Sequence, residues 1–165
     1  MIPKQALAEY IILWYKKQYK TDISPVKLQK ALYLLFAFWT GFAARSSSSE
    51  LKYIGLDESP YLFDADFAAW AYGPVDTQIY QWYKDKPVKY QIPQAKAVVK
   101  NACNEYQWAF IQDVLPKIFR TSDFSLIELT LKDICWKTAF PGLRKINNNE
   151  ILREYTHRTS LYGNE

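Results

Sequence analysis

The chain has 165 residues, enough for a single domain that buries an ordinary apolar core. Its two cysteines and one histidine are too few for a disulfide framework or a histidine–cysteine metal cluster, which favours the reducing cytosol and no cofactor. The longest apolar run, residues 31–44, is shorter than the roughly 20 residues that span a bilayer, and no cleavable apolar stretch opens the chain. We therefore expect one cytoplasmic domain over residues 1–165 with no membrane segment.

The net charge of +4 is unevenly placed along the chain. Residues 1–30 contain six lysines against Glu9 and Asp22, and residues 84–100 contain five lysines against Asp85. Such lysine-rich regions can steer an anionic partner, although scattered lysines are more often a solvated surface.

The first helix is predicted over residues 4–19, where apolar residues recur every three or four positions. The apolar face consists of Leu7, Tyr10, Ile11 and Trp14. The same period puts Glu9, Lys16 and Lys20 on the opposite, exposed face.

A second helix is expected to begin at Ser24 and Pro25, because serine caps helices and proline suits the first helical position. Apolar residues then cover much of its circumference, so this is predicted to be the central helix. The serine-rich segment after it, about residues 45–60, lacks periodicity and is predicted to be a mobile loop, with a short extended piece near residues 53–54.

Residues 61–75, YLFDADFAAWAYGPV, combine a predicted strand with a sharp turn. A two-residue period predicts a half-buried strand. Its two sides are Phe63, Ala65, Phe67 and Ala69 on one, and Asp64, Asp66 and Ala68 on the other. Gly73 is expected to adopt a positive φ, and Pro74 to begin a third helix that ends near Asp85.

The remaining chain is predicted to be helical with interruptions. Residues 86–101 are expected to be a loop, with the alternative that a helix begins at residues 95–99, and Pro116 should kink or divide a helix over residues 104–120. Ser122 caps a further helix whose face includes Leu126, Ile127, Thr130 and Ile134. Asn147 to Asn149 could cap a last short helix, and the tail from residue 157 is expected to fray. The predicted class is mainly α (α+β), a compact bundle of five or six helices with a small two-stranded β element.

Two sequence blocks resemble the Panacea domain, a SocA-like antitoxin family found in bacterial and phage-borne proteins. The first block is KLQKALYL, residues 27–34, and the second is the segment over residues 61–80. The matching residues are Lys27, Leu28, Gln29, Lys30, Tyr33, Leu62, Phe63, Asp64, Asp66, Ala69, Trp70, Tyr72, Gly73, Pro74, Val75, Ile79 and Tyr80. A third block aligns with residues 130–136 and ends at Trp136, but Leu131 and Cys135 replace the family's histidine and proline.

The resemblance implies an antitoxin that neutralises a toxin encoded nearby by direct protein contact. Some members of the family act as adaptors that hand the toxin to a protease. The resemblance therefore implies a binding protein and not an enzyme, with a protein toxin as the partner.

Candidate chemical groups are sparse. Asp64 and Asp66 share one face of the predicted strand and could hold a cation or perform acid–base work, but solvated or capping carboxylates are commoner. Cys103 and Cys135 lack a well-placed base, because His157 lies in the predicted tail. We expect no catalytic and no metal-ligating residues.

The remaining candidates concern binding. Lys27 and Lys30 lie on one side of the central helix and are expected to pair with Asp64 or Asp66, or to contact a partner. Trp70 is predicted to be a core residue, and Tyr72 is a candidate partner contact. The partner-binding set is thus Lys27, Lys30, Asp64, Asp66 and Tyr72. The alternative function is a nucleic-acid-binding regulator that uses the lysine-rich regions 1–30 and 84–100, including the aromatic and basic stretch 82–91. Without a known nucleic-acid motif, a protein partner is favoured over nucleic acid.

Overall fold

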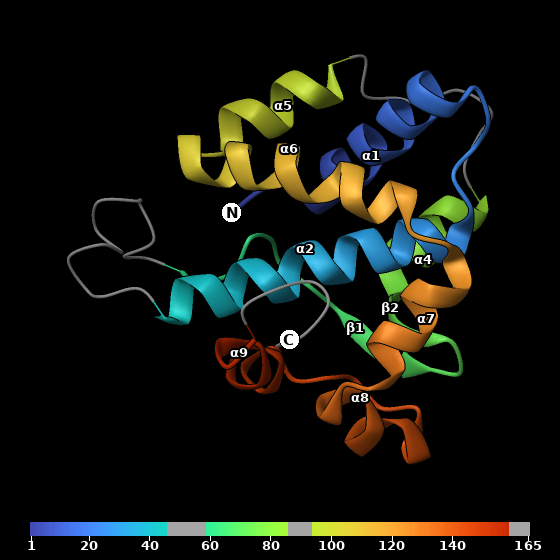
Figure 1. Ribbon diagram of the computed structural model, residues 1–165, viewed down its shortest axis with the longest axis vertical. Coiled ribbons are helices and arrows are strands. Elements are labelled where there is room, and N and C mark those ends of the chain that lie inside the picture. Colours follow the sequence, from blue (N-terminus) through green and yellow to red (C-terminus); the bar gives the residue numbers. More distant parts are fainter. Residues whose placement is uncertain (46–58, 86–93, 159–165) are drawn as a thin grey trace.

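The computed structural model describes residues 1–45, 59–85 and 94–158 (Figure 1). These residues confirm the predicted class, because they are mainly helical and include a small two-stranded antiparallel sheet. They form eight α-helices, more than the five or six predicted. The elements are α1 (Lys4–Tyr19), α2 (Pro25–Arg45), β1 (Phe67–Trp70), β2 (Gly73–Asp76), α4 (Thr77–Asp85), α5 (Ala95–Ala102), α6 (Glu105–Arg120), α7 (Asp123–Leu131), α8 (Ile134–Ala139) and α9 (Asn148–Thr156), with a 3-10 turn at Phe140–Gly142.

Helix α2 is the centre of the molecule, as predicted. It begins after Ser24, whose hydroxyl accepts a hydrogen bond of 3.0 Å from the Lys27 amide, so Ser24 caps the helix. In Figure 1, α1, α5 and α6 lie on one side of α2, whereas the strands, α8 and α9 lie on the other. The helix therefore separates two groups of elements and is buried between them.

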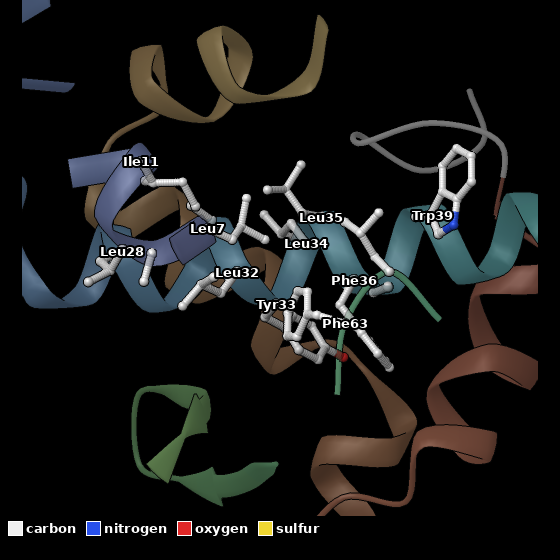
Figure 2. Packing of buried hydrophobic residues seen from close by; sticks show 14 of the residues in the cluster. Leu7, Ile11, Leu28, Leu32, Tyr33, Leu34, Leu35, Phe36, Trp39 and Phe63 are labelled. Carbon is white, nitrogen blue, oxygen red and sulfur yellow. The ribbon is translucent and has the colours of Figure 1, made fainter. Parts of the chain in front are cut away.

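The apolar core surrounds α2 (Figure 2). Leu7 and Ile11 of α1 approach one part of the helix, and Phe63, which precedes β1, approaches another. The α2 side chains Leu28, Leu32, Leu35 and Phe36 are completely buried. A helix that is apolar on nearly all sides needs such neighbours around its whole circumference.

The two strands form a hairpin whose register pairs Phe67 with Asp76 and Trp70 with Gly73. The predicted strand is too early, because residues 61–66 precede β1 and are not part of it. The short extended piece expected near residues 53–54 lies outside the described residues. On the edge of β1 away from β2, residues 144–146 pair with the strand: the Ala69 amide donates to the Arg144 carbonyl at 2.9 Å, and the Ile146 amide donates to the Phe67 carbonyl at 2.8 Å.

Pro74 lies in strand β2 and does not begin a helix, which corrects the prediction. A proline lacks an N–H, and an edge strand tolerates that loss. Helix α4 begins three residues later, because the Asp76 carboxylate accepts a hydrogen bond of 3.1 Å from the Ile79 amide and caps the helix.

Gly73 adopts a φ of +101°, which confirms the predicted positive φ. A Cβ added there would lie 2.6 Å from Thr130 Oγ1 and 2.8 Å from Lys30 Nζ. We expect Gly73→Ala to lower the free energy of unfolding by about 1–3 kcal/mol, through backbone strain and this close approach. Urea denaturation measures the change. Gly142→Ala is the matched control, because its Cβ would first meet the flexible Arg144 side chain at 3.0 Å. Equal losses for the two variants would contradict the role given to the Gly73 conformation.

Other boundaries differ from the predictions. Residues 95–101, expected to be a loop, belong to helix α5, as the alternative had it, and Pro116 lies inside an undivided α6. Ile134 does not share the α7 face: the chain turns at Asp133, and Ile134 begins α8 with a side chain that is 69% exposed. Glu9 is buried and not exposed.

Arg45 and Arg158, which belong to the two segments predicted to be mobile or frayed, make defined contacts. Arg45, placed at the start of the loop, ends α2 and donates to the carbonyls of Tyr155 and Thr156 at 2.8 and 3.0 Å. Arg158, placed in the tail, forms an ion pair of 2.8 Å with Asp133. Residues 46–58 and 159–165 of these two segments lie outside the described part. None of the described helices is long and apolar enough to cross a membrane.

Candidate interaction site

The residues of the first two family-like blocks meet in the structure. Gln29, Lys30 and Tyr33 of α2 are buried on the side that faces the hairpin and the α7–α8 junction. Gln29 and Lys30 make polar contacts with β2 and so fix the position of the hairpin, whereas Tyr33 contacts Asp133 at the α7–α8 junction. Leu28 and Val75 from the same blocks are also buried.

Gln29 holds the end of β2. The Asp76 amide donates to Gln29 Oε1 at 2.8 Å, and Gln29 Nε2 donates to the Asp76 carbonyl at 3.4 Å. The Asp76 carboxylate also accepts from Lys4 Nζ at 2.9 Å and from the Asp66 amide at 3.0 Å. Because Asp76 is fully buried, these partners compensate its lost hydration.

Lys30 lies behind the hairpin turn and is only 1% exposed. Its ammonium donates to the Pro74 carbonyl at 3.1 Å. No carboxylate among the described residues forms an ion pair with it, so the expected pairing with Asp64 or Asp66 is wrong. Burial lowers the pKa of Lys30 to about 7.

Lys27 also pairs differently from the prediction. Its ammonium donates to the Phe119 carbonyl at 3.1 Å and lies 3.6 Å from Asp123 Oδ1 and 5.8 Å from the centre of the Tyr15 ring. Lys27 therefore joins α2 to α1 and to the α6–α7 connection, and its carboxylate partner is Asp123 instead of Asp64 or Asp66.

Asp64 and Asp66 have separate environments. Asp64 is exposed, whereas Asp66 accepts from Thr77 Oγ1 at 3.0 Å and pairs with Lys145 at 2.6 Å. The Lys145 ammonium lowers the pKa of the Asp66 carboxyl. Among the described residues there is no group of three His, Cys, Asp or Glu that could hold a metal ion.

A second polar cluster surrounds Asp133 at the α7–α8 junction. Its carboxylate is fully buried and accepts hydrogen bonds from Tyr33 Oη at 2.5 Å, Tyr155 Oη at 2.7 Å and Arg158 at 2.8 Å. Burial raises the pKa of both phenols, so their hydroxyls stay protonated and donate. Three elements far apart in sequence are thus joined at one carboxylate.

The two cysteines are poor nucleophiles. Burial raises the pKa of Cys103 to about 11 and also raises that of Cys135, so both stay thiols at neutral pH. Cys135 and His157 line a common hollow of about 630 Å³, together with Glu154 and Arg158. Glu154 is occupied there, since it accepts from the amides of residues 134 and 135 and pairs with Arg158.

The exposed side of the hairpin is aromatic. Tyr72, at the turn, is 68% exposed. Trp70 is half-buried and packs edge-to-face on Tyr80 at 4.8 Å, so its predicted place in the core is wrong. Trp136 Nε1 donates to the Trp70 carbonyl at 2.9 Å, and its ring stacks on Phe140 at 4.6 Å. Trp136 itself is buried, so we call Trp70, Tyr72 and Tyr80 the hairpin surface.

The five predicted partner-binding residues do not form one exposed surface. Lys27 and Lys30 are buried, whereas Tyr72 and Asp64 are exposed. Sequence reasoning missed Asp76 and Asp133 as the acceptors that organise the two buried polar clusters. The only sequence signal for Asp133 is its place in the third family-like block.

Comparisons of the chain with protein-family models, with curated proteins and with solved structures find no significant match.

Proposed function

We propose that this chain is an antitoxin that binds a protein toxin encoded beside it and blocks the toxin through the hairpin surface. The proposal rests on the two family-like sequence blocks and on one structural observation. The first block lies behind the hairpin, and from the second block Tyr72 is exposed at the turn while Trp70 and Tyr80 are half-buried.

The chemistry of the hairpin surface suits a protein partner. Tyrosine and tryptophan are the residues that most often dominate binding energy at protein interfaces, because they bury a large area and lose little side-chain entropy. Tyr72 is 68% exposed and is two residues from Trp70, which packs edge-to-face on Tyr80, so Tyr72 can fill a pocket in a partner.

The hairpin is also held rigidly. Gln29 bonds both the amide and the carbonyl of Asp76, and Lys30 bonds the Pro74 carbonyl. A binding surface that is ordered before the partner arrives loses less conformational entropy on association. The buried polar residues of α2 therefore support binding indirectly, by presenting the aromatic side of the hairpin.

Co-expression with the adjacent small gene tests this function. That gene alone should arrest growth, growth should return when this chain is present, and the two proteins should co-purify. A harmless neighbour, or rescue without physical association, would contradict neutralisation by contact. The toxin's abundance during rescue distinguishes the two mechanisms, because an adaptor for a protease lowers it and simple occlusion does not.

Tyr72→Ala tests the surface itself. We expect the variant to bind the toxin at least about 30-fold more weakly, since truncating a central interface tyrosine typically costs about 2 kcal/mol. Phe124→Ala is the matched control, because Phe124 is 69% exposed on another element, α7. Binding is measured by calorimetry with both variants shown to be folded. Equal affinities of the Tyr72 variant and the unmodified chain would place the contact elsewhere.

A further inference from the structure

A second surface of the chain is a basic groove of about 690 Å³ between α1, α5 and α6. Lys17 and Lys20 come from the end of α1, and Lys96 comes from α5. The two lysine-rich regions of the sequence therefore meet at one place. Figure 1 shows these helices on the opposite side of α2 from the hairpin, so the groove is separate from the hairpin surface.

The positive charge of the groove is uncompensated. None of the three lysines forms an ion pair with a carboxylate of the described residues, and no residue that lines the groove in the described part is acidic. Lys16, one turn before Lys20, differs because it pairs with Asp22 at 2.9 Å.

The helix dipole explains only part of this arrangement. Lysines near the end of α1 are favoured by the carbonyls of its last turn. Lys96, in contrast, lies in the first turn of α5, where the dipole disfavours a cation. A cation kept in an unfavourable position beside two others points to an anionic ligand.

The rest of the lining is aromatic and amide. The groove includes the indole of Trp14 and the ring of Tyr10, whose centroids are 5.5 Å apart. Gln112 donates to the Tyr10 hydroxyl at 2.9 Å. Aromatic rings beside lysines are the combination that binds single-stranded nucleic acid, in which phosphates contact the cations and a base stacks on a ring. Trp14 is partly exposed, and an acidic peptide would use the lysines without needing this ring.

We propose that this groove binds single-stranded nucleic acid, with phosphates at Lys17, Lys20 and Lys96 and a base on Trp14. The inference does not depend on the antitoxin proposal, because it concerns a different surface.

The test is fluorescence anisotropy with labelled oligo(dT), oligo(U) and a duplex of equal length, at two or more salt concentrations. We expect the single strands to bind with a Kd on the order of 10 µM or tighter in low salt, and more tightly than the duplex. Replacing Lys17, Lys20 and Lys96 together by Gln should reduce the slope of log affinity against log salt by about 2. Trp14→Leu should weaken binding at least about 5-fold, the lower end of the effect of losing one base stack.

The matched control replaces Lys132, Lys137 and Arg153 by Gln, which removes the same charge from exposed positions outside the groove. This control should keep nearly all of the affinity. Equal losses of affinity in the two triple variants would mean that only the net charge of the chain matters, and this would overturn the proposal. So would the absence of oligonucleotide binding, or binding of a glutamate-rich peptide alone with the same dependence on the three lysines. An unchanged affinity in a folded Trp14→Leu variant would also overturn it. Circular dichroism of each variant checks folding. If the Trp14 variant unfolds, the triple replacement of Lys17, Lys20 and Lys96 still tests the proposal, because these side chains are exposed.

Discussion

Asp133→Ala should lower the free energy of unfolding by about 3–5 kcal/mol, because it removes the shared acceptor of a buried cluster. The substitution leaves the hydroxyls of Tyr33 and Tyr155 without their acceptor, and it leaves Arg158 without the carboxylate at 2.8 Å. Unpaired buried donors lose their hydration and gain nothing in return. Chemical denaturation followed by circular dichroism measures the change.

Two further variants show whether the loss comes from these contacts. Asp113→Ala is the matched control, because this exposed aspartate forms an i,i+4 pair with Lys117 on the surface, and its loss should cost less than about 0.5 kcal/mol. Tyr155→Phe, which removes one donor and keeps the ring, should cost much less in the Asp133→Ala background than in the unmodified chain. A loss below about 1 kcal/mol for Asp133→Ala, or simple additivity with Tyr155→Phe, would show that the cluster contributes little.

Local signals in the sequence were sufficient for most helices. Ser24, Ser122 and Asn147 each cap a helix through the side-chain hydrogen bond that their residue types predict. The positive φ of Gly73 also followed from the residue type. Such features depend on a few neighbouring residues, and a single sequence contains that information.

The errors arose where distant residues decide the structure. Pro74 suits a helix start, but Asp76 takes the capping role and Pro74 pairs with Ala69 in the hairpin. Glu9 was placed by helical period alone, yet α5 packs on α1, so more than one face of α1 is covered. Asp133 meets Tyr33 across 100 residues of chain, and no local pattern specifies such a partner.

The same reason explains how much of the candidate sites was predicted. Tyr72 was singled out from its place in the motif, and it is exposed on the hairpin surface. The lysine-rich regions were noted as charge, but only the packing of α5 on α1 brings Lys96 beside Lys17 and Lys20. Charge content is visible in a sequence, whereas its convergence on one groove depends on the tertiary fold.

Lys30 should make the stability of the chain depend on pH above neutrality. Burial lowers the pKa of Lys30 in the folded chain to about 7 from 10.5. Between pH 7 and pH 10.5 the Lys30 side chain is therefore neutral in the folded chain and charged in the unfolded chain. The unfolded state then binds the extra proton, and the free energy of unfolding rises with pH by about 1.4 kcal/mol per pH unit. From pH 7 to 9.5 this contribution amounts to about 3 kcal/mol, and below pH 7 the burial penalty is complete and constant.

Lys30→Met isolates this contribution, because methionine fills similar space without a charge. As pH rises from 7 to 9.5, the unfolding free energy of the unmodified chain should rise relative to that of the variant. At pH 6 the variant should be the more stable, although it loses the hydrogen bond to the Pro74 carbonyl, which is worth about 1 kcal/mol. Lys132→Met, at an exposed position, should leave the pH dependence unchanged. Parallel curves for the unmodified chain and Lys30→Met would mean that Lys30 keeps an ordinary pKa, and that its ammonium reaches water despite its position behind the hairpin.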